Sequence, residues 1–230
     1  VLAMGDYSTG GPFGFLLNDR NPRDLFSSRF TVFEVDKLSG INDSRFYSLC
    51  ILCIMNSFNA KMRNTPGMKV MVIEEAWKAI ANETMAPFLT GLWKTARKYS
   101  TSAVVVTQQI TDIMSSSVIN DTILQNSSVR ILLDQSNNLN NFDQIKTLLG
   151  LSDHQKAMIL SMNRNNSPRY RYREVFIALG DRRCGVYATE VSPEEAIAYE
   201  SSKEKKKPFL ELQQSKGAIA AIRELTEGKS

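Results

Sequence analysis

Glu74 and Glu75 directly follow four apolar residues, VMVI at 70–73. An uninterrupted apolar run of this kind is typical of a strand that is covered on both faces. Acids at the end of such a strand can hold a magnesium ion or polarise a water molecule for nucleotide hydrolysis. The same pair could also be a solvated strand end that leads into a helix, whose N-terminus favours acids. The pair is therefore half of a candidate nucleotide site and needs partners.

Polar residues follow the next apolar run in the same way, because Thr107 and Gln108 end the segment SAVVVTQ at 102–108. The carboxyl ends of parallel strands lie at one edge of a sheet, so these side chains are expected beside the acid pair. A glutamine there can bond a water or a phosphate oxygen without adding charge. A Thr-Gln start of an ordinary helix remains the alternative.

Arg97 lies in the basic stretch KTARKYS at 94–100, just before that second strand. It could simply complement the negative C-terminal end of a helix. An arginine at a subunit edge could also reach the phosphate held by a neighbouring subunit. Spacing alone favours the first of these two roles.

A phosphate-binding loop of the form GxxxxGK[ST] is missing. Gly-Lys-Ser occurs only at 228–230, where Arg223 replaces the first glycine and no helix can follow. The glycines of GGPFG at 10–14 have no accompanying lysine. We therefore expect that these residues alone neither cradle a triphosphate nor hydrolyse ATP.

Short apolar strands alternate with helical stretches, which predicts an α/β fold with a parallel sheet and right-handed crossovers. After residue 141 two helices precede a predicted antiparallel hairpin, which is expected to extend one edge of the sheet. The expected strands are 29–35, 68–74, 102–108 and 129–135, with the hairpin at 169–179 and 184–191. Three regions are predicted: a loop segment at 1–28, a core at 29–200, and a charged linker with an amphipathic helix at 201–230.

The composition of the chain limits which partners and metal sites can be expected. The net charge is +4, which does not by itself indicate a nucleic-acid partner. No apolar run reaches the length of about 18 residues that predicts a transmembrane helix, and the N-terminus does not resemble a signal peptide. Cys50 and Cys53 lie in an apolar helical stretch and are expected to be core thiols, because further ligands at zinc spacing are lacking.

Four stretches together carry a family resemblance: 8–17 (STGGPFGFLL), 71–80 (MVIEEAWKAI), 94–113 and 120–135. In this order they resemble the C-terminal part of the TraG-type conjugation ATPases of Bacteroides conjugative transposons, within the motor ATPases of type IV secretion. The resemblance implies a RecA-like P-loop NTPase core, mainly a parallel sheet flanked by helices, truncated before its P-loop. Open sheet edges and self-association would then be expected.

The resemblance also implies roles for single residues. Glu74 would be the magnesium-side acid, Glu75 the acid that polarises water, and Gln108 the sensor glutamine. Arg97 would be the arginine of the motif before the sensor strand, and Thr107 would lie with the nucleotide-binding residues. ATP and Mg²⁺ are the implied cofactors.

At the level of the whole protein, the resemblance implies a hexameric ATPase that is cytoplasmic and peripheral at the inner membrane. It would act with other type IV secretion components and power pilus assembly or the transfer of DNA or protein.

A non-catalytic interpretation rests on the Arg/Tyr strip, which we define as residues 164–173. A basic strip can hold phosphates and tyrosines can stack bases, so single-stranded DNA binding is one possibility. A solvated edge strand whose charges discourage edge pairing is the other, and we favour it. A structural module whose acid pair does no chemistry also stays open. The strip comprises Arg164, Arg169, Tyr170, Arg171, Tyr172 and Arg173.

Overall fold

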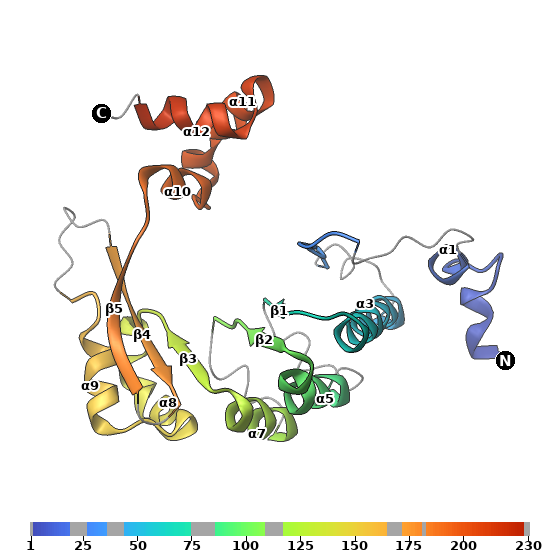
Figure 1. Ribbon diagram of the computed structural model, residues 1–230, viewed down its shortest axis with the longest axis horizontal. Helices are drawn as coiled ribbons and strands as arrows, with labels where there is room; N and C mark the ends of the chain where they lie inside the picture. Colours follow the sequence, from blue (N-terminus) through green and yellow to red (C-terminus); the bar gives the residue numbers. More distant parts are fainter. Residues whose placement is uncertain are drawn as a thin grey trace. The chain divides into compact units, whose positions relative to one another are not determined.

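The computed structural model shows an α/β chain that divides into two compact units, Val1–Ser127 and Ser128–Ser230 (Figure 1). The α/β class and the C-terminal antiparallel hairpin are confirmed. The structure describes residues 2–18, 27–35, 44–74, 86–108, 117–164, 172–180 and 183–227.

The first unit is built on two parallel strands. β1 (Lys69–Ile73) and β2 (Thr101–Val105) pair in register from their first residue to their last. The chain returns from one strand to the other through α5 (Ala86–Thr95) and the 3-10 helix η2 (Ala96–Tyr99). The two apolar runs that were predicted as neighbouring parallel strands are therefore confirmed as such.

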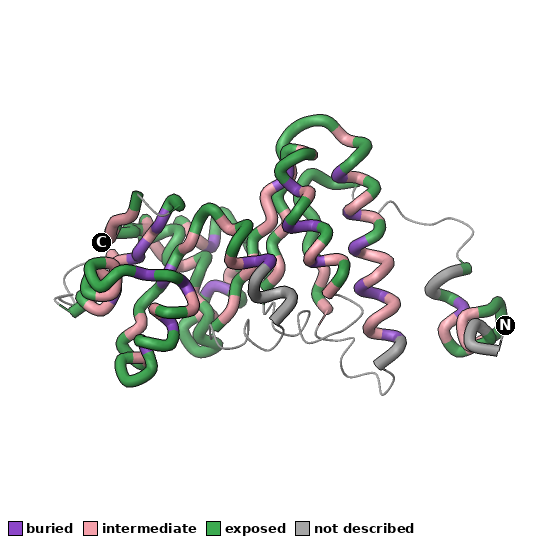
Figure 2. The backbone as a smooth tube through the Cα atoms, turned by 90° about the horizontal axis from the view of Figure 1, so that it is seen from below, coloured by how far each residue is buried: buried purple, intermediate pink, exposed green. Residues whose placement is uncertain are grey.

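Helices cover one face of this strand pair. α3 (Ser44–Asn64), α5 and α7 (Ser117–Asn126) each contribute buried side chains to a common core. Buried positions recur along the helices with exposed positions between them, as expected for helices that pack on one side (Figure 2). The core consists of Phe58, Met62, Leu89, Leu92, Trp93, Ala96 and Ile123, against which Met71, Ile73, Ala103 and Val105 of the strands pack.

The other face of the strand pair is exposed. Val70 and Val72 of β1 are 56% and 61% exposed, and Val104 of β2 is also exposed. Side chains alternate along a strand, so these residues all project from the face opposite the core. The expectation that both faces are covered is therefore wrong for this chain.

Residues 29–35 do not form the predicted strand. The backbone bends at residues 27–30 and has no regular structure at 31–35. Phe30 and Val32 are strongly exposed. An alternating pattern yields a strand only when a second strand satisfies the backbone N–H and C=O groups, and no strand within the described ranges pairs here.

The second unit contains a three-stranded antiparallel sheet in the order β3-β4-β5. β3 (Val129–Leu132), β4 (Tyr172–Leu179) and β5 (Arg183–Glu190) include the predicted hairpin. β4 lies in the middle of this sheet. β3 pairs with β4 only from Phe176 to Leu179, so Tyr172 and Arg173, where the Arg/Tyr strip enters β4, pair with β5 alone and lie at an edge on their other side.

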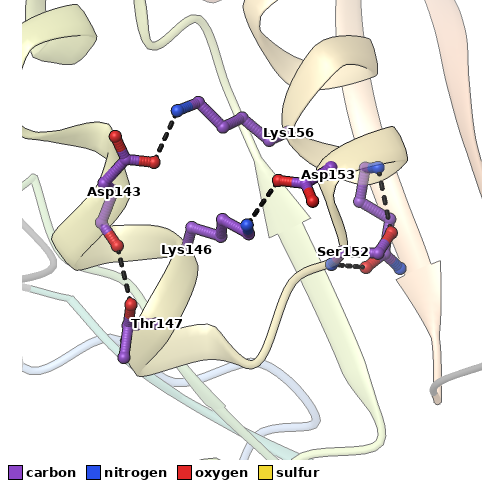
Figure 3. Close-up of polar contacts among 7 residues, drawn as sticks. Asp143, Lys146, Thr147, Ser152, Asp153 and Lys156 are labelled. Carbon is purple, nitrogen blue, oxygen red and sulfur yellow. Dashed lines mark hydrogen bonds and ion pairs between the residues drawn. The ribbon is translucent and has the colours of Figure 1, made fainter.

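Two reciprocal ion pairs join α8 (Phe142–Leu149) to α9 (Asp153–Ser161), and each helix contributes one lysine and one aspartate. Lys146 pairs with Asp153, and Lys156 pairs with Asp143 (Figure 3). Both carboxylates are largely exposed, so water screens each pair and neither adds much to stability. The turn between the helices depends more on Gly150, whose φ of 62° ends α8 in the left-handed region that favours glycine.

Three helices end the chain: α10 (Pro193–Ala198), α11 (Lys203–Lys216) and α12 (Ala218–Glu227). Residues 203–208 were expected to belong to a linker, but they form the first turns of α11. Gly217 separates α11 from α12, so the amphipathic helix expected in this region is divided into two helices. Within the described part of the chain, none of the helices has the length and apolar character that a membrane crossing requires.

Candidate functional site

The carboxyl edge of the β1–β2 pair carries the predicted site. Beyond the last paired residues, the Val106 N–H donates to the Ile73 carbonyl at 2.9 Å. This bond continues the register by one step, so Glu74 and Thr107 follow the two strands at the same edge. Gln108 comes next in the chain. Glu74 and Gln108 are exposed and Thr107 is half-buried, while Glu75 lies outside the described residues.

The side chains at this edge fit a magnesium ion better than a soft metal. They offer a carboxylate, a hydroxyl and an amide oxygen, which are the hard oxygen donors that Mg²⁺ prefers. No cluster of three or more His, Cys, Asp or Glu residues suits a metal anywhere in the described ranges. The edge therefore fits the part of a nucleotide site that faces the ion and the attacking water, and it does not supply a cradle for phosphates.

Arg97 lies at the opposite edge of the same strand pair. It belongs to η2, which ends two residues before β2 begins. A strand rises about 3.3 Å per residue, so the five residues of β2 put roughly 15 Å between the two edges. Glu74, Thr107 and Gln108 thus follow the strands at the carboxyl edge, and Arg97 precedes β2 at the opposite edge.

The glycine-rich stretch at 8–17 is a packed turn that leads into the short helix α1 (Gly14–Leu17), and not an open loop. A Cβ on Gly14 would lie 2.2 Å from the Ser8 carbonyl oxygen, and one on Gly11 would lie 2.4 Å from that of Asp6. The Asn18 amide closes the turn by donating to the carbonyls of Tyr7 and Gly14, both at 2.7 Å. Close backbone packing, rather than phosphate binding, accounts for these two glycines.

The Arg/Tyr strip is described only at its two ends. Arg164 and Arg173 are exposed, and Tyr172 is half-buried at the start of β4. Arg169, Tyr170 and Arg171 lie outside the described residues. The single-stranded DNA binding considered for the strip therefore stays a prediction.

Asn163 anchors the start of this strip, and sequence reasoning missed it. Pairing between β3 and β4 stops at Phe176, two residues short of Glu174. There the Asn163 side chain replaces the partner strand: Oδ1 accepts the Glu174 N–H at 2.9 Å, and Nδ2 donates to the Glu174 carbonyl at 3.5 Å. The Asn163 N–H donates in turn to the Glu174 carboxylate at 2.7 Å.

Asp134 extends this contact to the end of β3. Asn163 Nδ2 donates to Oδ2 of Asp134 at 3.3 Å. The backbone N–H of Ser136 donates to the same carboxylate and is the main reason that the pKa of Asp134 lies below its usual value. The hydrogen bond from Asn163 and the positive charge of Arg173 also lower this pKa. Asp134 therefore remains an ionised acceptor for Asn163.

We predict that Asn163→Ala lowers the free energy of unfolding of the second unit by about 1–3 kcal/mol, because backbone groups of Glu174 lose their partner. The backbone of Asn163 has a φ of 58°, in the left-handed region. Alanine adopts this conformation at a free-energy cost about 1 kcal/mol higher than glycine does. Asn163→Gly should therefore be milder than Asn163→Ala. Urea unfolding followed by circular dichroism measures both, and two neutral variants would contradict the role given to the amide.

Comparison with known proteins identifies a matching family and a solved structure with a similar fold. The sequence profile of the TraG P-loop domain matches residues 1–229. Among solved structures, VirB4 of Thermoanaerobacter pseudethanolicus is similar, with a TM-score of 0.54 and 23% sequence identity. The similarity covers 73% of this chain and 43% of that protein, so the chain spans less than half of its length. At this identity the likeness concerns the fold alone, and no curated protein matches the chain.

Proposed function

The chain belongs to the family of TraG P-loop domains, and on that basis we propose that it forms the water- and magnesium-facing part of an ATPase of conjugative, type IV secretion transfer. One observation carries the proposal. The bond from the Val106 N–H to the Ile73 carbonyl holds the ends of β1 and β2 together, so Glu74 and Gln108 share one edge. A hydrolytic site of this class needs an ion-side acid and a water-orienting amide close together.

Each residue at this edge has a proposed role. Glu74 holds Mg²⁺ through its carboxylate, and Glu75, the next residue in the chain, accepts a proton from the attacking water. Gln108 orients that water and Thr107 assists in binding the nucleotide. When bound, Mg²⁺ neutralises charge on the phosphates of ATP.

Arg97 is proposed to act on a neighbouring subunit. Its position about 15 Å from the carboxyl edge prevents it from reaching Glu74 of its own chain. An arginine that reaches a neighbour's phosphate requires assembly of several copies, and we propose a hexamer. This proposal uses the exposure of Arg97, which leaves the guanidinium accessible to a partner.

The cellular role of the chain is also a proposal. ATP hydrolysis would power pilus assembly or the transfer of DNA or protein, at the cytoplasmic face of the inner membrane and with other secretion components. The match of the TraG P-loop domain to residues 1–229 is the support for this role.

The test compares two proteins. Residues 1–230 alone are expected to show no magnesium-dependent ATP hydrolysis, because GxxxxGK[ST] between a strand and a helix is missing. A longer version that adds such a strand–loop–helix unit is expected to hydrolyse ATP. Release of inorganic phosphate measures both, and clear hydrolysis by residues 1–230 alone would contradict the proposal.

A further inference from the structure

Charge is distributed very unevenly over α3, α5, η2 and the two strands of the first unit. In the described ranges 44–74 and 86–108 the chain has seven basic residues and one acid, Glu74. Glu74 lies at the carboxyl edge of the strand pair. Six of the basic residues lie within a few residues of the opposite, amino edge, and we call them the amino-edge cluster. The cluster consists of Lys61, Arg63, Lys69, Lys94, Arg97 and Lys98.

The fold itself explains why the cations gather there. α3 ends five residues before β1 begins, and the α5–η2 segment ends two residues before β2 begins. In such a unit the C-terminal ends of the helices lie at the amino ends of the strands. Helix C-termini carry partial negative charge and accommodate cations, so both helices place theirs at the same edge.

Two cations of the cluster lie against one aromatic ring. The Arg63 guanidinium lies 5.4 Å and the Lys98 ammonium 6.0 Å from the centre of the Tyr99 ring. The Lys69 N–H donates to the Ser100 carbonyl at 3.0 Å, which joins the start of β1 to the end of η2. The described parts of α3, η2 and the start of β1 carry no carboxylate that could neutralise these cations. The cations therefore create a strongly positive surface.

We propose that the amino-edge cluster binds the phosphate backbone of single-stranded nucleic acid. This proposal does not depend on the ATPase proposal, since that proposal uses only Arg97 of the cluster and the binding proposed here needs no nucleotide. The proposed contact of Arg97 with a neighbouring copy uses one cation of the cluster, and Arg63, Lys94 and Lys98 are exposed as well. A flexible strand carries a phosphate on every nucleotide and can follow cations that belong to α3, β1 and η2.

The salt dependence of binding should reflect the number of phosphates contacted. Four side chains of the cluster are exposed: Arg63, Lys94, Arg97 and Lys98. Four contacts to a single strand predict that log K falls with log salt at a slope of about −3. Fluorescence anisotropy of a labelled dT oligonucleotide of about 20 nucleotides measures this slope without ATP present.

The test variant replaces Arg63, Lys94 and Lys98 by Ala and keeps Arg97, which is part of the proposed ATPase machinery. It should bind about tenfold more weakly or worse, and its slope should be shallower by about 2. The matched control replaces Lys203, Lys205 and Lys207 of α11, which are also exposed, and should bind like the unchanged chain. Unfolding by heat must be similar for the two variants; if the triple variant is unfolded, Lys94→Ala with Lys98→Ala serves in its place.

Several results would overturn the proposal. An equal loss in both variants would mean that only net charge matters. A loss in Arg169→Ala, Arg171→Ala, Arg173→Ala, with normal binding by the amino-edge variant, would assign nucleic acid to the Arg/Tyr strip. Binding to vesicles of anionic phospholipid but not to the oligonucleotide would assign the surface to a membrane. Absence of any binding at low salt would also reject it.

Discussion

Glu75→Gln is expected to lower the turnover of ATP by about 10²- to 10⁴-fold in the longer version that includes a phosphate-binding loop. Glutamine has nearly the same shape as glutamate, so the nucleotide should still bind. The amide cannot accept a proton from the attacking water, which is why hydrolysis alone should fail. Phosphate release measures turnover, and the fluorescence of a labelled ATP analogue measures binding.

Two other carboxylates serve as comparisons for this experiment. Glu190→Gln removes an exposed acid at the end of β5, outside the proposed site, and should leave turnover unchanged. Glu74→Gln should instead raise the Mg²⁺ concentration that half-maximal activity requires, because Glu74 is the proposed ligand of the ion. Normal turnover in Glu75→Gln would exclude this residue as the acid that polarises water.

The carboxyl edge was predictable because its determinants are local. Two apolar runs, each followed by polar residues, specify two strands, and parallel pairing then fixes which ends meet. The side chains of Glu74 and Gln108 needed no further information to be placed at one edge. Their chemical roles remain proposals, since the position of a residue does not show what it does.

Other features depended on partners that are distant in the sequence. Residues 29–35 have the alternation of a strand but lack a neighbouring strand, and β4 lies in the middle of its sheet because β3 pairs with it across more than 40 residues. Asn163 could not be recognised from the sequence either. Its amide replaces a strand at Glu174, and only the tertiary structure brings those residues together.

Phe176→Ala is expected to destabilise the second unit by about 3–5 kcal/mol, the largest effect on stability that we predict. Phe176 is fully buried and lies on β4 where both pairings meet, opposite Leu132 of β3 and Val186 of β5. Removing the ring loses its transfer free energy and leaves a cavity that a central strand cannot close by shifting. Leu179→Ala, on the same strand but 52% exposed, should cost about 0.5 kcal/mol or less.

The two tryptophans make this experiment specific for one unit. Both tryptophans fall within residues 1–127, and the buried Trp93 makes their fluorescence a reporter of the first unit, while circular dichroism reports both units. If the units unfold separately, Phe176→Ala should lower the urea midpoint seen by circular dichroism and leave the tryptophan midpoint in place. A shift of both midpoints would show that the units unfold together. A change below about 1 kcal/mol in either signal would contradict the central position given to Phe176.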